Sequence, residues 1–186
     1  MKPPLGDTLV ICDMDNTLLT AKEGIPACNR AVIRLYTSLG GLFTVATGRP
    51  PESIRAALGD IRLSLPAISC NGALLYDFST ESVLHRATLN REQATTAILD
   101  ILNKFPRMGV EVMAGNGEMY VIHANEGYPR PSGGEHLGSI ACPVESVPDG
   151  WIKVVFASDP ESIRKLGQYA KTKYYGRDNY FPCPLP

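Results

Sequence analysis

Short apolar runs alternate with amphipathic segments over the first 79 residues of the chain. The runs at 8–13, 42–49 and 66–72 predict strands that lead into turns, and the first is typical of a buried strand. Between them, 26–39 and 51–58 are predicted as helices with proline near the first turn. The residues expected on the apolar face of the first helix are Val32, Leu35 and Leu39. The alternation of strand and helix favours a parallel sheet with right-handed crossovers.

The pattern changes near residue 80, where helices and strands no longer alternate regularly. Asn90 and Gln93 have the spacing of a capping box, and 125–150 is rich in Gly and Pro, which predicts an irregular loop. The predicted elements are, in order, a strand at 81–89, a helix at 90–105, a hairpin at 110–123, a strand at 151–157 and a helix at 160–173. We therefore expect two domains, 1–79 with a parallel sheet and 80–186 of α+β type with an antiparallel sheet.

Composition and charge narrow the class of protein. Hydrophobic residues make up 44% and charged residues 20%, as in globular domains, and the net charge is −1. Neither half is basic, which argues against nucleic acid or a membrane surface as partner. No apolar run approaches the length of a membrane span, and the first residues lack the apolar core of a signal peptide. Five scattered cysteines without a CxxC pattern indicate reduced thiols, so a cytoplasmic protein is expected.

Polar side chains follow all three predicted strands of the first half. Because ligands bind at the carboxyl ends of parallel strands, we expect these side chains to meet at one site. The candidates are Asp13, Asp15, Thr17, Thr47, Gly48, Arg49, Asn71 and Gly72.

The two aspartates are separated by one residue, and this spacing suits a pair of carboxyl groups that act together on one substrate. Asp13 and Asp15 directly follow an apolar strand, and burying carboxylates costs several kcal/mol unless they are paired. A divalent cation makes such charge tolerable. One carboxylate can then attack phosphorus while the other, one residue further on, protonates the leaving oxygen. Thr17 and the amides after Asp13 can bind phosphate oxygens.

"DMDNTLL" resembles the nucleophile motif of the haloacid dehalogenase (HAD) superfamily of phosphatases, and "TVATGR" resembles its second motif. "ISCNGALLYD" looks like the third core strand of the Cof-type subfamily, after which a cap domain follows. The resemblance implies a partial Rossmann-like parallel core, 1–79, with an α+β cap, 80–186. It also implies a phosphatase of small phosphorylated metabolites, such as sugar phosphates.

The resemblance assigns roles at the strand ends. Asp13 would be the nucleophile that forms an aspartyl-phosphate, and Asp15 the general acid and then the base. Mg²⁺ would be held by Asp13, the Asp15 backbone carbonyl and the phosphate. Thr47 would bind the transferring phosphoryl group. The family usually has Gly where this chain has Asn16, which tolerates the left-handed conformation.

Other candidate roles stay open at this stage. Gly48 and Gly72 would line the pocket, and Asn71 would either line it as well or be a plain turn residue. Arg49 would either neutralise phosphate or make a structural ion pair.

The sequence departs from the family after the cap. A Lys and an acidic pair that complete the superfamily's site are not found at the expected place, so we expect a shortened chain. Lys153, Asp159 and Glu161 could replace them, although Asp159-Pro160 also fits a helix cap. The alternative function is a non-catalytic binding or regulatory module. Because the other half of the core would normally flank 8–13, we also expect an open strand edge and self-association.

Overall fold

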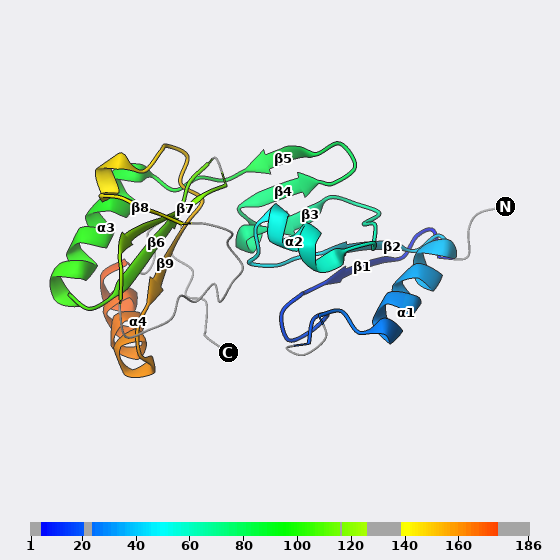
Figure 1. Ribbon diagram of the computed structural model, residues 1–186, viewed down its shortest axis with the longest axis horizontal. Helices are drawn as coiled ribbons and strands as arrows, with labels where there is room; N and C mark the ends of the chain where they lie inside the picture. Colours follow the sequence, from blue (N-terminus) through cyan, green and yellow to red (C-terminus); the bar gives the residue numbers. More distant parts are fainter. Residues whose placement is uncertain (1–4, 21–23, 116, 126–138, 175–186) are drawn as a thin grey trace. The chain divides into compact units, whose positions relative to one another are not determined.

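The protein has an α/β fold of two compact units, 1–87 and 88–186, shown in Figure 1. The computed structural model describes residues 5–20, 24–115, 117–125 and 139–174. Each unit has its own sheets and its own apolar core.

The first unit begins with the predicted alternation of strands and helices. Its elements are β1 (Leu9–Cys12), α1 (Ala27–Ser38), β2 (Leu42–Val45), α2 (Pro51–Leu58), β3 (Ala67–Ser69), the 3₁₀ turn η1 (Cys70–Gly72), β4 (Leu74–Asp77) and β5 (Ser82–Arg86). Strands β1 and β2 are parallel, with Leu9 opposite Leu42. A parallel bridge between Ala46 and Ile68 joins the end of β2 to β3. The predicted parallel arrangement of the three strand ends is therefore present.

The boundary between the units differs from the predicted domain boundary. Strand β5 pairs antiparallel with β4, which pairs antiparallel with β3. The strand predicted at the start of the second domain thus belongs to the sheet of the first unit. The division falls after Ala87 and not after residue 79, because the β4–β5 hairpin continues the β3 sheet.

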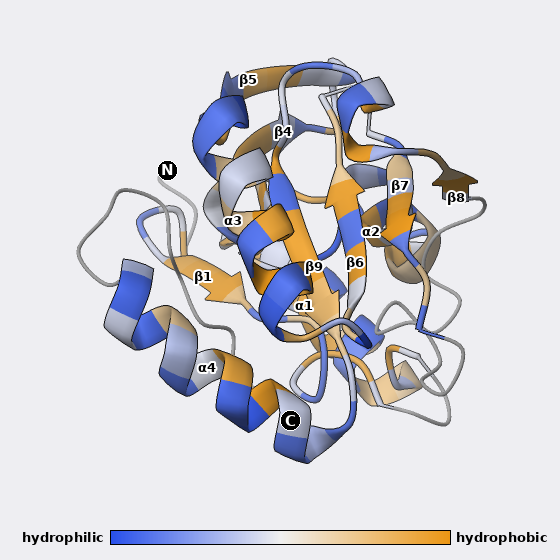
Figure 2. Ribbon diagram, turned by 90° about the vertical axis from the view of Figure 1, so that its left-hand side faces the viewer, coloured by the Kyte–Doolittle hydropathy of each residue, from blue (hydrophilic) through white to orange (hydrophobic). Residues whose placement is uncertain are grey.

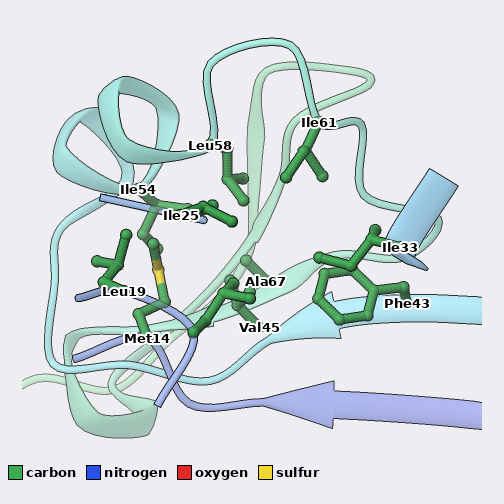
Figure 3. Close-up of a cluster of buried hydrophobic side chains, with 11 residues drawn as sticks. Met14, Leu19, Ile25, Ile33, Phe43, Val45, Ile54, Leu58, Ile61 and Ala67 are labelled. Carbon is green, nitrogen blue, oxygen red and sulfur yellow. The ribbon is translucent and has the colours of Figure 1, made fainter. Parts of the chain in front are cut away.

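The core of the first unit lies between the sheet and its helices (Figure 3). Helix α1 contributes Ile33, whereas Val32 and Leu35 are 64% and 61% exposed, so the predicted apolar face is wrong. Tyr36 lies on the side of the helix that packs against the core. Its hydroxyl donates to the Thr8 carbonyl at 2.7 Å, and its ring lies where a side chain on Gly41 would be.

Strand β1 is less buried than its sequence predicted. Leu9, Val10 and Ile11 are 46%, 40% and 50% exposed, so neither face of the strand is well covered. Figure 2 shows the strand in the colour of apolar residues. Among the described residues, β1 pairs with β2 alone. The prediction of a buried strand is therefore wrong, because the described elements leave side chains on both faces of β1 exposed.

The second unit is a four-stranded sheet with two helices. Its elements are α3 (Arg91–Lys104), β6 (Gly109–Met113), β7 (Met119–His123), β8 (Ser139–Ala141), the 3₁₀ turn η2 (Val144–Ser146), β9 (Lys153–Ala157) and α4 (Pro160–Tyr174). The strand order is β8-β7-β6-β9, and only the β7–β8 pair is parallel. The predicted hairpin and both helices are confirmed. Strand β8 and η2 lie within the predicted loop, whose residues 126–138 are outside the described part.

Both helices of this unit pack on the same face of the sheet. Phe156 of β9 contacts the apolar cluster around Ile98 of α3 and the one that contains Leu166 of α4. Figure 2 shows β6 and β9 as largely apolar strands, whereas α3 and α4 carry many polar residues. The Asn90 side chain accepts a 3.0 Å hydrogen bond from the Gln93 amide, which caps α3 as predicted.

Candidate active site

The loop after β1 holds two exposed carboxylates on either side of a buried methionine. Met14 is fully buried, whereas Asp13 and Asp15 are exposed. Figure 3 shows the Met14 side chain in the apolar cluster together with Leu19 and Ile54. Met14 packs into the core while its two neighbours are exposed, so the loop holds both carboxylates away from the core.

A tight turn fixes this loop directly after the aspartates. The amides of Leu18 and Leu19 donate to the Met14 carbonyl at 3.0 and 2.7 Å. Asn16 has φ 57°, the left-handed conformation that its short side chain was expected to tolerate. The Thr17 hydroxyl donates to Asp13 Oδ2 at 3.3 Å, so the turn returns this side chain to the first aspartate.

The turn after β2 is tied to the ends of both neighbouring strands. The Ala46 amide donates to the Cys12 carbonyl at 2.9 Å, and the Thr47 amide donates to Ile68 at 2.9 Å. The Thr47 carbonyl then accepts from the Asn71 amide at 3.0 Å. These bonds bring the ends of β1, β2 and β3 together, as the sequence predicted.

Gly48 and Asn71 are in close contact. A Cβ on residue 48 would lie 2.6 Å from Asn71 Oδ1, so only glycine fits there without a shift. Cys70 and Asn71 both have positive φ, 52° and 58°, in the turn that carries this side chain. Gly72 follows with φ 90°, and open space surrounds the position of its missing Cβ.

Arg49 makes an ion pair with Asp15. Its Nη2 and Nε lie 2.7 and 3.0 Å from Oδ1 and Oδ2 of the carboxylate, which is a two-point contact. Its Nη1 donates to the hydroxyl of Ser53 at 2.9 Å. Ser53 is buried on the first turn of α2, and sequence reasoning missed it. No spacing rule marks it in the sequence, because Arg49 lies before the start of α2.

Cys12 lies beside the first aspartate. Burial raises the pKa of its thiol, and the nearby Asp13 charge raises it further. The thiol donates to the Asp13 carbonyl at 3.1 Å. Cys12 is therefore a protonated structural group at the base of the loop.

Asp159 and Glu161, the two acidic residues considered as substitutes for the missing motif, lie at the start of helix α4, and Asp159 caps this helix. Asp159 Oδ1 accepts from the amides of Glu161 and Ser162 at 3.0 and 2.9 Å, and its Oδ2 accepts from the Ser162 hydroxyl at 2.6 Å. The Ser162 side chain is the main reason that the pKa of Asp159 falls to about 2. Glu161 pairs with Lys165 one turn further along α4. This geometry favours the helix-cap interpretation over a metal site.

Few groups at the strand ends are available to a metal ion. The described residues contain no group of three or more His, Cys, Asp or Glu side chains that could hold one. The Asp15 carboxylate is paired with Arg49, which leaves the Asp13 carboxylate as the acidic side chain of the loop without a cationic partner in the described contacts. Mg²⁺ prefers about six oxygen ligands, so these residues do not form a complete magnesium site.

Solved structures share the fold of this chain. A haloacid dehalogenase-like hydrolase from Bacteroides thetaiotaomicron superposes with a TM-score of 0.75 at 15% identity, covering 95% of this chain and 68% of that one. A haloacid dehalogenase-like hydrolase from B. subtilis gives 0.71 at 17% identity, covering 90% and 67%. The family of haloacid dehalogenase-like hydrolases matches residues 10–180. The chain belongs to this family, which confirms the resemblance found in the motifs.

Curated relatives are similar to this chain over less than a third of their length. The 5-amino-6-(5-phospho-D-ribitylamino)uracil phosphatase YwtE of Bacillus subtilis is 37% identical over 93 residues, 50% of this chain and 31% of that protein. The pyridoxal phosphate phosphatase YbhA of Escherichia coli is 32% identical over 76 residues, 41% and 28% of the two chains. The aligned segments thus span about a third of these relatives. Among the described residues, no helix is long and apolar enough to cross a membrane.

Proposed function

We propose that this chain carries the nucleophile and the proton donor of a phosphatase that hydrolyses phosphoric monoesters of small metabolites. The observation that carries the proposal is the placement of Asp13 and Asp15 on the side of the loop opposite the buried Met14. Family membership and the phosphatase names of the relatives support the same reaction.

The proposed reaction has two steps. An Asp13 oxygen attacks phosphorus, the bond from phosphorus to the leaving oxygen breaks, and Asp15 gives that oxygen its proton. Water then attacks the aspartyl-phosphate while Asp15 takes a proton from it, which releases inorganic phosphate and restores both carboxyl groups. The Thr17 hydroxyl and Thr47 would bind phosphate oxygens beside Asp13.

Magnesium enters the proposal as a cofactor for which this chain would supply only some of the ligands. A bound Mg²⁺ would neutralise charge on the phosphate. Asp13 and the Asp15 backbone carbonyl would be the ligands that this chain offers, and the remainder must come from outside the described residues. The mechanism above therefore uses the side chains of this chain alone.

We infer a small substrate from two features. Both named relatives act on phosphorylated small molecules, a phosphoribitylamino uracil and pyridoxal phosphate. The second unit, which begins at Thr88, would serve as the cap that encloses a substrate of this size. We propose a sugar phosphate as the substrate class, because a ligand of this size can be enclosed by a cap domain.

Two other features of the chain belong to the same proposal. Cys12, Cys28, Cys70 and Cys142 are free thiols, which supports a cytoplasmic location. The exposed edge of β1 supports self-association of the chain through pairing of two first strands about a two-fold axis.

The test is hydrolysis of para-nitrophenyl phosphate in the presence of magnesium. Asp13→Asn should abolish turnover and leave the circular dichroism spectrum unchanged. Asp60→Asn is the matched control, because Asp60 is an exposed aspartate that pairs with Arg30 away from the strand ends. Mass spectrometry after acid quenching should find the phosphoryl group on Asp13. Turnover in the Asp13→Asn variant would exclude Asp13 as nucleophile.

A non-catalytic binding module is the second candidate function. The incomplete set of metal ligands in the described residues favours it. Such a module would bind a phosphorylated ligand at the same strand ends and show no turnover at any magnesium concentration. Absence of hydrolysis together with binding of inorganic phosphate, measured by calorimetry, would favour this function over the first.

A further inference from the structure

Arg49 has two candidate roles, and the contacts of its side chain separate them. An arginine that binds phosphate offers two N–H groups of one edge to the ligand. Here the edge formed by Nε and Nη2 is occupied by the Asp15 carboxylate, and Nη1 donates to Ser53. The side chain is only 17% exposed. This geometry does not present the guanidinium to a phosphate.

Without this contact Asp15 would have little to hold it. Its side chain is 49% exposed and stands on a turn next to the left-handed Asn16. A two-point contact with a planar guanidinium fixes both the position and the plane of a carboxyl group. Proton transfer is efficient only when the donor lies within hydrogen-bond reach of its target, so the orientation of Asp15 affects the rate.

Arg49 is itself held from two directions. Its amide donates to Thr47 Oγ1 at 3.2 Å, and its carbonyl accepts from the Ser69 hydroxyl at 2.7 Å. Its side chain is anchored by Ser53, which is 8% exposed on the buried side of α2. A substitution of the Arg49 side chain therefore leaves the backbone bonds of the turn in place.

We propose that Arg49 is a positioning residue that orients Asp15 for proton transfer, with buried Ser53 as its anchor, and is not a phosphate ligand. The proposal rests on the proposed function, because it assigns Asp15 the role of proton donor. The protonated form of Asp15 would keep Oδ1 as the acceptor of Nη2 and carry its proton on Oδ2, in place of the contact with Nε, and the ionised form that remains after the transfer restores the two-point contact. It predicts a loss that depends on the leaving group of the substrate.

The experiment compares phenyl phosphate with para-nitrophenyl phosphate, whose better leaving group needs less protonation. Arg49→Gln should lower kcat for phenyl phosphate about tenfold and for para-nitrophenyl phosphate clearly less, with KM unchanged within about twofold. Ser53→Ala should give a smaller loss with the same dependence. Arg49→Lys should recover only part of kcat, because an ammonium group makes a single-point contact. Arg55→Gln is the matched control, since Arg55 pairs with Glu81 and should leave both constants unchanged.

The outcomes distinguish the two proposals. A rise in KM for both substrates with unchanged kcat would make Arg49 a phosphate ligand and overturn the positioning role. If Asp13→Asn is inactive but Arg49→Gln behaves like Arg55→Gln, the positioning role alone fails. If the wild type shows no turnover, the proposed function fails. The contact between Arg49 and Asp15 is then tested by the chemical shift of the Arg49 Nε–H signal in an NMR spectrum. A signal that shifts in both Asp15→Asn and Ser53→Ala supports the positioning role, and one that shifts in neither overturns it.

Discussion

Gly48 and Asn71 stand so close that a single methyl group on residue 48 would lie 2.6 Å from Asn71 Oδ1. The Asn71 backbone N–H is bonded to the Thr47 carbonyl, so the backbone stays in place and the Asn71 side chain must rotate away. We expect Gly48→Ala to destabilise the first unit by about 1 kcal/mol, because the added group forces the Asn71 side chain out of its present rotamer. Urea unfolding followed by circular dichroism measures the difference.

A double-variant cycle isolates the cause. Asn71→Gly removes the side chain and tolerates the positive φ of that position. In its presence Gly48→Ala should cost clearly less than in the wild type. Equal costs in both backgrounds would show that the backbone of residue 48, and not Asn71, requires glycine.

The sequence predicted the strand ends better than the faces of the helices. Asp13, Thr47 and Asn71 follow strands that the apolar runs mark clearly, and parallel pairing places such ends at one edge. The buried side of α1 could not be predicted, because Ile33 is as apolar as Val32 and Leu35 and only the packing of the helix in the fold decides which of them is buried. The role of Arg49 was left open for the same reason, since Asp15 and Ser53 lie in different elements.

Asp100 should make the second unit sensitive to acid. Hydrogen bonds from Lys173, then from Tyr174 and Tyr169, lower its pKa to about 2. Because the folded pKa lies below the unfolded value of 3.8, the stabilisation is complete above pH about 4 and is lost as the pH falls toward 2.

The Asp100→Asn variant tests this dependence. In urea titrations it should be less stable at pH 6, and its stability should decline less between pH 4 and 2 than that of the wild type. Asp159 has a similarly lowered pKa, so Asp159→Asn is measured in parallel. Parallel pH profiles for the wild type and Asp100→Asn would contradict a role for this carboxylate.

Magnesium should bind weakly to this chain. Asp13 offers one carboxylate, and the described residues contain no cluster that completes the shell. We expect a dissociation constant on the order of millimolar or weaker by calorimetry, and no detectable heat for Asp13→Asn. A micromolar constant would mean that ligands outside the described residues complete the site.

One edge of β1 pairs with no strand in the part of the chain that the structure describes, and this edge should cause self-association. Ile11 is 50% exposed on this strand, and a charged residue on an exposed edge opposes pairing with another chain. Sedimentation equilibrium at micromolar concentration should show dimers or larger species for the wild type and a shift toward monomer for Ile11→Lys. Leu99→Lys, at an equally exposed site on α3, is the control. A monomeric wild type, or equal shifts in both variants, would contradict pairing through β1.

Met14 links the stability of the first unit to the geometry of its proposed site. It is fully buried, and its two neighbours in the chain are the carboxylates of the loop. A change of volume in the core around Ile54 must therefore reach Asp13 and Asp15 through a single shared stretch of backbone. Substitutions of Met14 must preserve both the packing of the core and the placement of the two carboxylates. A substitution that leaves the fold intact can therefore still alter the proposed reaction.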